Sequence, residues 1–161
     1  KKLSSMRIIK LKPLTKFEFT KFGDVLDPAE ANPQFNFCVN ILNSLDGART
    51  NVALIKAPIL KLPYKIALLQ RNPLSWQSYL PLGSTHYSII VAHSGPYGSP
   101  NLETLTGFSV PSGIGVSFHP KTWHAHPCCF SDPGHLVMIV EEFATFGDCN
   151  SLQIDPFKLV E

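Results

Sequence analysis

At 161 residues, the chain is long enough to bury a hydrophobic core and short enough to form one domain. Its content of 44% hydrophobic and 16% charged residues excludes an intrinsically disordered chain. The formal net charge is +2, and the basic residues do not cluster beyond the first twelve positions. Without a cluster of basic residues, no nucleic-acid partner is expected. No apolar run approaches the ~20 residues of a membrane helix, so no membrane partner is expected either.

The start of the chain and its cysteines bear on domain limits and compartment. Residues 1–5 are expected to be a leader or tail, and residues 6–161 a single domain. No apolar signal-peptide core follows the basic start, and the four cysteines show no C-x-x-C spacing. We therefore expect a cytoplasmic protein.

One helix is predicted near the start of the chain, over residues 15–22. Thr15 and Glu18 form a capping-box pattern, in which the hydroxyl and the carboxylate each satisfy a backbone N–H at the start of a helix. Gly23 suits the left-handed conformation that commonly ends a helix.

The rest of the chain predicts short strands separated by turns. The candidate strands are residues 37–42, 52–55, 65–69, 77–81, 87–92, 106–110, 115–118, 123–128 and 136–140. Many short strands at near-regular spacing indicate a sandwich or a barrel, and the 14 prolines disfavour long helices. Strands such as 136–140 are apolar on both faces and therefore need a cover on each side.

Three of the six histidines lie in the short segment from His119 to His126. If His124 and His126 are on one strand, they face the same way, because side chains alternate along a strand. Such a pair suits metal binding or acid–base chemistry, since imidazole titrates near neutral pH and binds divalent metals. The alternative is a pair of hydrogen-bonded core residues without a catalytic role.

A longer pattern resembles one enzyme family. The segments that carry it read, in chain order, P-L-T (13–15), F-G-D-V (22–25), I-K-A (55–57), L-P (62–63), L-Q-R-N-P (69–73), Q-S-Y-L-P (77–81), G-V-S-F-H (115–119) and T-W-H (122–124). They resemble P-L-T, F-G-D-V, F-R-A, L-P, L-E-(R/K)-H-P, Q-x-F-x-P, G-V-x-Y-H and x-W-H of the ureidoglycolate lyases. The glycine-rich turn at 113–115 and the His-Pro-Lys-Thr-Trp-His after it also resemble the second motif of the cupin barrel.

The resemblance implies an all-β, cupin-like barrel (a double-stranded β-helix) with one or two short peripheral helices. It also implies a homodimer that splits ureidoglycolate into glyoxylate and urea in allantoin and purine degradation. Catalytic roles would fall to His124, His119 and His126, of which His124 and His126 are also candidate metal ligands. Substrate-binding roles would fall to Arg71, Lys121, Gln77 and Trp123, with Arg71 or Lys121 holding the substrate carboxylate.

Two positions depart from the family pattern where that pattern carries ionisable groups. Gln70 and Asn72 replace Glu and His, and neither amide titrates near neutral pH. We therefore expect no cofactor beyond, at most, a weakly bound divalent metal. The same departures favour an alternative function: a catalytically silent relative that binds a small polar ligand or acts as a dimeric structural module. The retained Trp123-His124 pair favours the lyase.

Overall fold

The computed structural model describes residues 6–34, 48–131, 134–143 and 149–161, so the strand predicted at 37–42 lies outside the described residues. The described chain consists mainly of strands. Its helices are the four-residue α1 (Lys16–Phe19) and the 3₁₀ turns η1 (Pro28–Glu30) and η2 (Leu102–Thr104). No helix in this part of the chain has the length and apolar character needed to cross a membrane.

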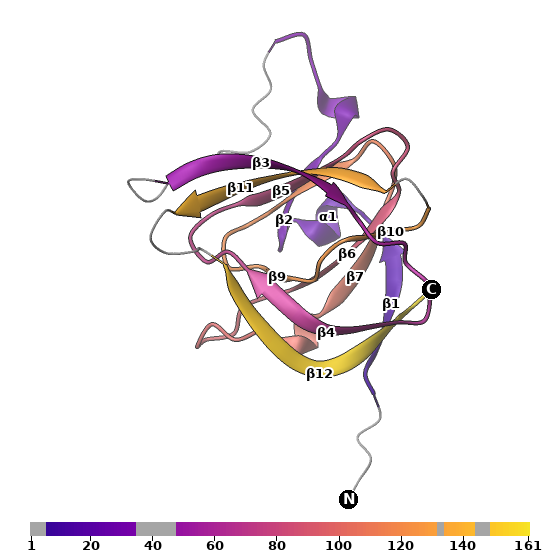
Figure 1. The fold of residues 1–161 in the computed structure, drawn as a ribbon, viewed down its shortest axis with the longest axis vertical. Coiled ribbons are helices and arrows are strands. Elements are labelled where there is room, and N and C mark those ends of the chain that lie inside the picture. Colours follow the sequence, from indigo (N-terminus) through magenta and orange to yellow (C-terminus); the bar gives the residue numbers. More distant parts are fainter. Residues whose placement is uncertain (1–5, 35–47, 132–133, 144–148) are drawn as a thin grey trace, which may run out of the picture.

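Six strands of the first sheet close into a barrel (Figure 1). In order around the ring, they are β6 (Tyr87–Ala92), β7 (Thr106–Val110), β1 (Ile8–Pro13), β12 (Asn150–Val160), β4 (Tyr64–Arg71) and β9 (Trp123–His124). The ring closes because β9 pairs with both β4 and β6. β10 (Cys128–Cys129) adds to β6, and β1 runs parallel to both of its neighbours.

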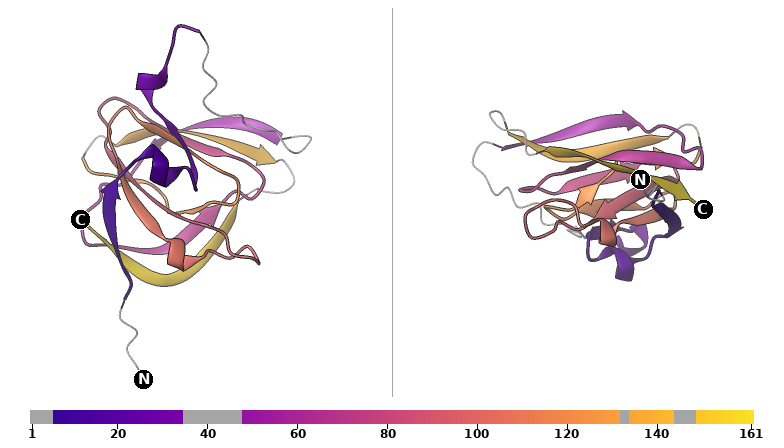
Figure 2. Two further views of the ribbon diagram at one scale, coloured as in Figure 1. Left: turned by 180° about the vertical axis from the view of Figure 1, so that it is seen from behind. Right: turned by 90° about the horizontal axis from the view of Figure 1, so that it is seen from below.

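A second, five-stranded sheet packs on one side of the barrel, and the two layers are visible from below in Figure 2. Its order is β2 (Gly23–Leu26), β8 (Gly115–Phe118), β5 (Gln77–Pro81), β11 (His135–Phe143) and β3 (Ala48–Lys56). All of its pairs are antiparallel. The architecture confirms the predicted all-β, cupin-like barrel with short peripheral helices.

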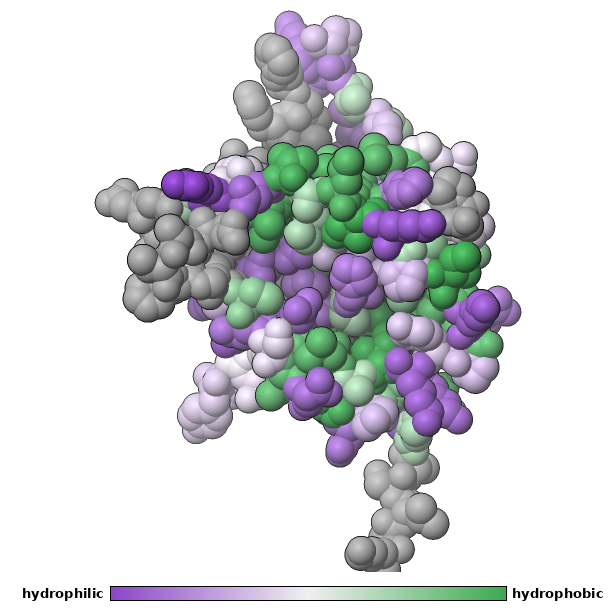
Figure 3. Space-filling model, viewed as in Figure 1, coloured by the Kyte–Doolittle hydropathy of each residue, from purple (hydrophilic) through white to green (hydrophobic). Residues whose placement is uncertain are grey.

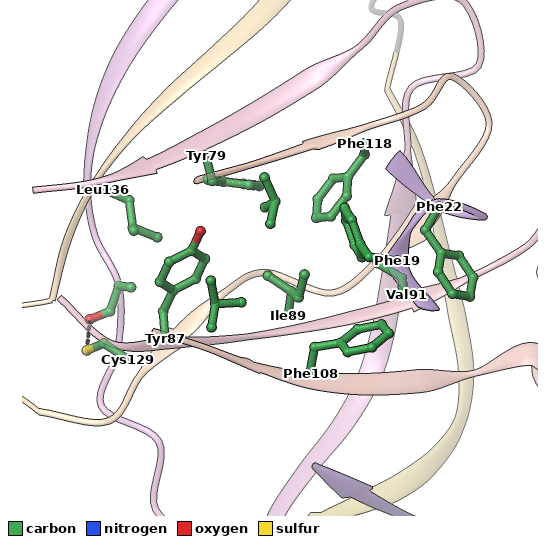
Figure 4. Packing of buried hydrophobic residues seen from close by; sticks show 13 residues of the cluster. Phe19, Phe22, Tyr79, Tyr87, Ile89, Val91, Phe108, Phe118, Cys129 and Leu136 are labelled. Atoms are coloured by element: carbon green, nitrogen blue, oxygen red, sulfur yellow. Dashed lines mark hydrogen bonds between the residues drawn. The ribbon is translucent and has the colours of Figure 1, made fainter. Parts of the chain in front are cut away.

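The core lies on both sides of β6, which is buried at every residue. On one side, Tyr87 and Ile89 belong to a cluster with Phe118 of the second sheet (Figure 4). On the other side, Ile90 belongs to a cluster with Phe157 inside the barrel. The strand is therefore covered on both faces, as its continuous apolar sequence predicts.

The predicted helix is present but shorter than residues 15–22. Thr15 caps α1, and its Oγ1 accepts a hydrogen bond from the Glu18 N–H at 3.3 Å. The Phe22 N–H donates to the Phe19 carbonyl at 2.8 Å, so a tight turn follows the helix directly.

The prediction that Gly23 ends this helix in the left-handed conformation is wrong. Gly23 begins β2 and is not among the described glycines with positive φ. Its small size is needed for a different reason, because a Cβ at this position would lie 2.0 Å from the carbonyl oxygen of Ser117 on β8.

Four predicted strands are confirmed without change as β5, β6, β7 and β8. The strands predicted at 52–55, 65–69 and 136–140 lie within the longer β3, β4 and β11. The strand predicted at 123–128 is divided into β9 and β10 by residues 125–127, where Pro127 has no N–H to give to a ladder. β1, β2 and β12 are not predicted from the sequence. Pro156 obscures β12, but it lies at a shift of register between Gln153 and Phe157, where a proline is tolerated.

Candidate active site

A cavity of about 450 Å³ lies between β3, β5 and β11 of the second sheet and the end of β4 in the barrel. Its wall is rich in amide side chains, namely Asn51, Gln70, Asn72 and Gln77. The other polar residues of the wall are Tyr79, His126, Glu141 and Cys149. Several of these positions belong to the motifs at 69–73 and 77–81, so the fold brings two separate segments of the pattern together.

Strand alternation and register account for much of this wall. Gln77 and Tyr79 are two residues apart on β5 and therefore face the same side of the sheet. Gln77 lies beside Val140 and Tyr79 beside Met138 on β11, and Val140 in turn lies beside Asn51 on β3. All five line the cavity, so the inner face of the second sheet is partly polar here.

A chain of hydrogen bonds joins three of the polar residues. Asn72 Nδ2 donates to Gln77 Oε1 at 2.9 Å, and Gln77 Nε2 donates to the Tyr79 hydroxyl oxygen at 2.7 Å. Gln77 Nε2 also lies 3.1 Å from Met138 Sδ. Asn72, Gln77 and Tyr79 are all buried, so this chain is a fixed part of the cavity wall.

His124 is buried beside the cavity rather than in its wall. It pairs in register with Gln70 on β4 and Val91 on β6, and its ring stacks on Phe118 at 4.7 Å between centroids. Its Nδ1 lies 3.2 Å from the Thr122 carbonyl oxygen. Burial lowers the pKa of His124 to about 4, because the Thr122 carbonyl only partly offsets the loss of water. The ring is therefore neutral at pH 7.

His126 lies in the cavity wall, in the segment between β9 and β10. The expected arrangement of His124 and His126 on one strand does not occur, because β9 ends at His124. Partial burial lowers the pKa of His126 below its ordinary value of 6.5, so its imidazole is also neutral at pH 7.

His119 lies outside this wall. Its Nε2 is 3.6 Å from Asp24 Oδ2, and its ring meets Trp76 edge-on at 4.6 Å between centroids. The fold therefore places the three predicted histidines in three settings: His126 in the cavity wall, His124 buried next to it, and His119 half-exposed beside an acidic side chain.

The predicted carboxylate holders also lie outside the described lining of the cavity. Arg71 stacks over the Trp123 ring at 5.0 Å and donates to Asn150 Oδ1 and Ser94 Oγ, each at 3.1 Å. Trp123 is buried and donates through Nε1 to the Gly98 carbonyl oxygen at 3.0 Å. Lys121 is exposed in the turn before β9, with a φ of 73°. No Lys or Arg is among the described residues of the cavity wall.

The donor set does not fit a metal ion. Within the part of the chain that the structure describes, no group of three or more His, Cys, Asp or Glu side chains is close enough to hold one. A divalent metal in a catalytic site usually has about three protein ligands. We therefore derive no chemical step through a metal.

Comparison with known proteins identifies the family of the chain. The family model described as ureidoglycolate lyase matches residues 6–161. The chain belongs to the ureidoglycolate lyase family. Proteins named ureidoglycolate lyase from Pseudomonas paraeruginosa (strain DSM 24068 / PA7) and Pseudomonas fluorescens (strain SBW25) are similar to it, with 28% and 27% identity over 155 and 158 residues. These alignments cover 90% of this chain and 89% and 90% of those proteins.

A third protein of that name, from Burkholderia mallei (strain NCTC 10229), is 28% identical over 131 residues, which cover 76% of this chain and 75% of that protein. The membership of the ureidoglycolate lyase family that the motifs predict is confirmed. The predicted class of protein, an enzyme of the lyase type, is confirmed with it.

Of the described residues of the cavity wall, the site predicted by sequence contains Gln77 and His126. Tyr79, Glu141 and Cys149 are among those that it misses. Tyr79 could have been found from alternation, because it follows Gln77 by two positions on a predicted strand. Glu141 follows the apolar run 136–140. It is buried, it accepts from Thr50 Oγ1 at 2.6 Å, and its Oε2 has no hydrogen-bond partner among the described residues. Cys149 resembles the cysteine of an Asp-Cys pair near the end of the family pattern, and the pairing of β12 with β4 brings its neighbourhood to the cavity.

Proposed function

We propose that the protein splits ureidoglycolate into glyoxylate and urea, in the cytoplasm, as a step of allantoin degradation. The observation that carries the proposal is the meeting, in one cavity, of residues from two separate motifs of the family with the imidazole of His126. The three cysteines that the structure describes are free, which suits a reducing compartment.

The reaction needs one group that accepts and returns a proton. A base removes the hydroxyl proton of ureidoglycolate, the electron pair of that O–H bond forms the aldehyde C=O, and the C–N bond breaks. The electrons of the C–N bond leave with the urea nitrogen, which takes up a proton. His126 suits the base because burial keeps its pKa below 6.5 and its ring neutral at pH 7. The protonated ring then returns the proton to the urea nitrogen.

The amide side chains suit the ureido group of the substrate. A ureido group presents N–H donors and a carbonyl acceptor, and side-chain amides offer the matching acceptor and donors. Gln70 of β4 and Gln77 of β5 line the cavity from opposite sheets, so a ureido group between them would contact both walls. Gln77 would take part through Oε1 as an acceptor, because its amide nitrogen faces Tyr79 and Met138.

Arg49 is our candidate for binding the substrate carboxylate. It precedes Asn51 by two residues on β3, so alternation places both side chains on the face that carries the cavity. It is exposed, which suits a guanidinium at the cavity mouth that holds a carboxylate in two hydrogen bonds. The roles predicted for Arg71, Lys121, Trp123, His119 and His124 stay predictions.

The proposal is tested by measuring glyoxylate release from ureidoglycolate. His126→Ala should lower kcat by on the order of a hundredfold or more, the usual effect of losing a general base. His86→Ala is the matched control, because the His86 ring forms a hydrogen bond with Ser109 Oγ and lies outside the cavity wall. Wild-type protein that binds ureido compounds but releases no glyoxylate would establish the silent relative instead.

We also propose a homodimer that forms through the outer face of β3. Val52 and Leu54 on that face are 68% and 79% exposed. Ile139 and Val137 of β11 lie beside them in register, and hydrophobic side chains gather over this part of the molecule in Figure 3. A twofold dimer needs only one self-complementary patch, which an apolar sheet face supplies.

A further inference from the structure

The cavity wall contains one phenol hydroxyl among its described residues, that of Tyr79. Tyr79 is the central residue of β5. Its side chain is 2% exposed, and its ring meets Phe118 edge-on at 5.8 Å between centroids. A phenylalanine would fill the same space, so the hydroxyl is the one group that tyrosine adds to this position.

The hydrogen bonds around Tyr79 leave its proton for another acceptor. Gln77 Nε2 donates to the Tyr79 oxygen at 2.7 Å and lies 3.1 Å from Met138 Sδ. A thioether sulfur only accepts, so the nitrogen of the Gln77 amide must face both atoms. Asn72 Nδ2 donates to Gln77 Oε1, the oxygen of the same amide, at 2.9 Å. The Tyr79 oxygen therefore accepts from Gln77, and among the described residues no side chain or carbonyl receives its proton.

The hydroxyl also keeps its proton at every pH at which the protein would work. Burial raises the pKa of Tyr79 far above its ordinary value of 10.0, and the hydrogen bond from Gln77 only partly offsets this rise. Tyr79 is thus a neutral hydrogen-bond donor in a cavity whose described wall has no Lys or Arg.

We infer that Tyr79 is a catalytic residue whose hydroxyl donates a hydrogen bond to the substrate oxygen on the carbon where the C–N bond breaks. This inference rests on the proposed function. That oxygen gains negative charge as its proton leaves and loses it when the aldehyde C=O forms. A donor already aimed at the oxygen stabilises the transition state more than the bound substrate. Tyr79 forms and breaks no covalent bond, and Gln77 is its positioning residue.

The substrate oxygen at this carbon is the partner that best matches a single neutral donor. The ureido group of the substrate matches the amides of the wall, which offer donors and acceptors together. The carboxylate of the substrate calls for a cation such as a guanidinium. The hydroxyl oxygen, which becomes the aldehyde oxygen, is the remaining polar atom.

Tyr79→Phe tests the inference, with Tyr87→Phe as the matched control. Tyr87 is also fully buried, but its hydroxyl donates to the Ile114 carbonyl oxygen at 2.8 Å and it does not line the cavity. Tyr79→Phe should lower kcat by on the order of a hundredfold and leave KM within a few-fold, the pattern of a contact made in the transition state. Tyr87→Phe should keep the wild-type kcat. Equal kcat in both variants and the wild type would overturn the inference.

A binding measurement separates this inference from the proposed reaction. Oxalurate has a carbonyl oxygen on the carbon in question, whereas N-carbamoylglycine has only hydrogens there. Wild-type protein and Tyr87→Phe should bind oxalurate more tightly than N-carbamoylglycine in calorimetry, by about two- to twelve-fold for one neutral hydrogen bond. Tyr79→Phe should lose this difference.

If the difference depends on Tyr79 but wild-type protein releases no glyoxylate, Tyr79 binds this oxygen and the proposed reaction is wrong. If the wild type binds the two compounds equally, or binds neither, the inference is wrong even when glyoxylate is released. Matching melting temperatures of the two variants would exclude misfolding as the cause.

Discussion

The two faces of the second sheet reverse the ordinary distribution of polar and apolar residues near β3. The inner face carries Asn51 and Gln77 toward a cavity, whereas the outer face exposes Val52 and Leu54 to solvent. A soluble domain normally buries its apolar side chains and hydrates its amides. Where this order is reversed, a ligand or a partner is the usual reason, which is why we propose the inner face as the site and the outer face as the dimer interface.

The largest predicted effect is on the pH dependence of stability. It comes from the buried His124, whose ring stacks on Phe118 of the second sheet. Its pKa is about 4 in the folded protein and 6.5 in the unfolded chain, so only the unfolded state takes up this proton between those values. The free energy of unfolding should therefore fall as the pH is lowered through this window, by about 3 kcal/mol from this residue. Urea denaturation at pH 7, 5 and 4 measures the fall.

His124→Gln removes the titrating ring, so its stability should depend less on pH than that of the wild type. The exposed His135→Gln is the control and should retain the wild-type slope. Parallel pH curves for the wild type and His124→Gln would contradict the buried, neutral state of His124. The rate of glyoxylate release per folded molecule of His124→Gln would also show whether His124 has the catalytic role that the sequence predicts.

A smaller effect is expected at the mouth of the cavity. Arg49→Gln should raise KM for ureidoglycolate about tenfold with little change of kcat, because a lost charged hydrogen bond weakens binding by about 1.5 kcal/mol or more. The control is Arg7→Gln, which removes an exposed guanidinium that pairs with Glu103, donates to the Leu102 carbonyl and lies outside the cavity wall. A rise of KM in Arg71→Gln but not in Arg49→Gln would identify Arg71, the residue predicted from sequence, as the carboxylate holder.

The smallest effect on the folded chain is expected on the outer face. Leu54→Lys should leave the free energy of unfolding within about 0.5 kcal/mol when both proteins are monomeric, because the side chain is exposed. It should nevertheless convert a dimer into a 17.8 kDa monomer in sedimentation at micromolar concentration. Leu68→Lys places the same charge at an exposed position on the barrel strand β4 and should leave the dimer intact. A wild-type monomer would refute the proposed interface.

Many strands of this fold can be predicted from the sequence, because the signals that mark a strand lie in neighbouring residues. The strands at 77–81 and 87–92 have clear turn signals on both sides, and both are observed at those bounds. The ring is not predictable in the same way, since its closure depends on pairs such as Ile8 with Lys158 that are far apart in the sequence. Gly23 shows the limit of local rules, because a contact with Ser117 from a distant strand explains this glycine.

The candidate site is also predictable only where local sequence signals mark its residues. The motifs lead to Gln77, and the histidine-rich segment leads to His126, and both line the cavity. The prediction that His124 accompanies His126 on one strand is wrong, because the strand ends between them. The position of Arg71 could not be derived from sequence, since it depends on stacking against Trp123, some fifty residues away in the chain.

The pairing of β1 with β12 has a consequence for how the chain is made. These are the first and last strands of the described chain, and they lie side by side in the ring (Figure 1). β1 is synthesised before β12, and the other four strands of the ring are synthesised between them. Until β12 emerges, β1 and β4 each present an unpaired edge that could join another nascent chain. The ring therefore cannot close before β12 has left the ribosome, and its closure covers both edges at once.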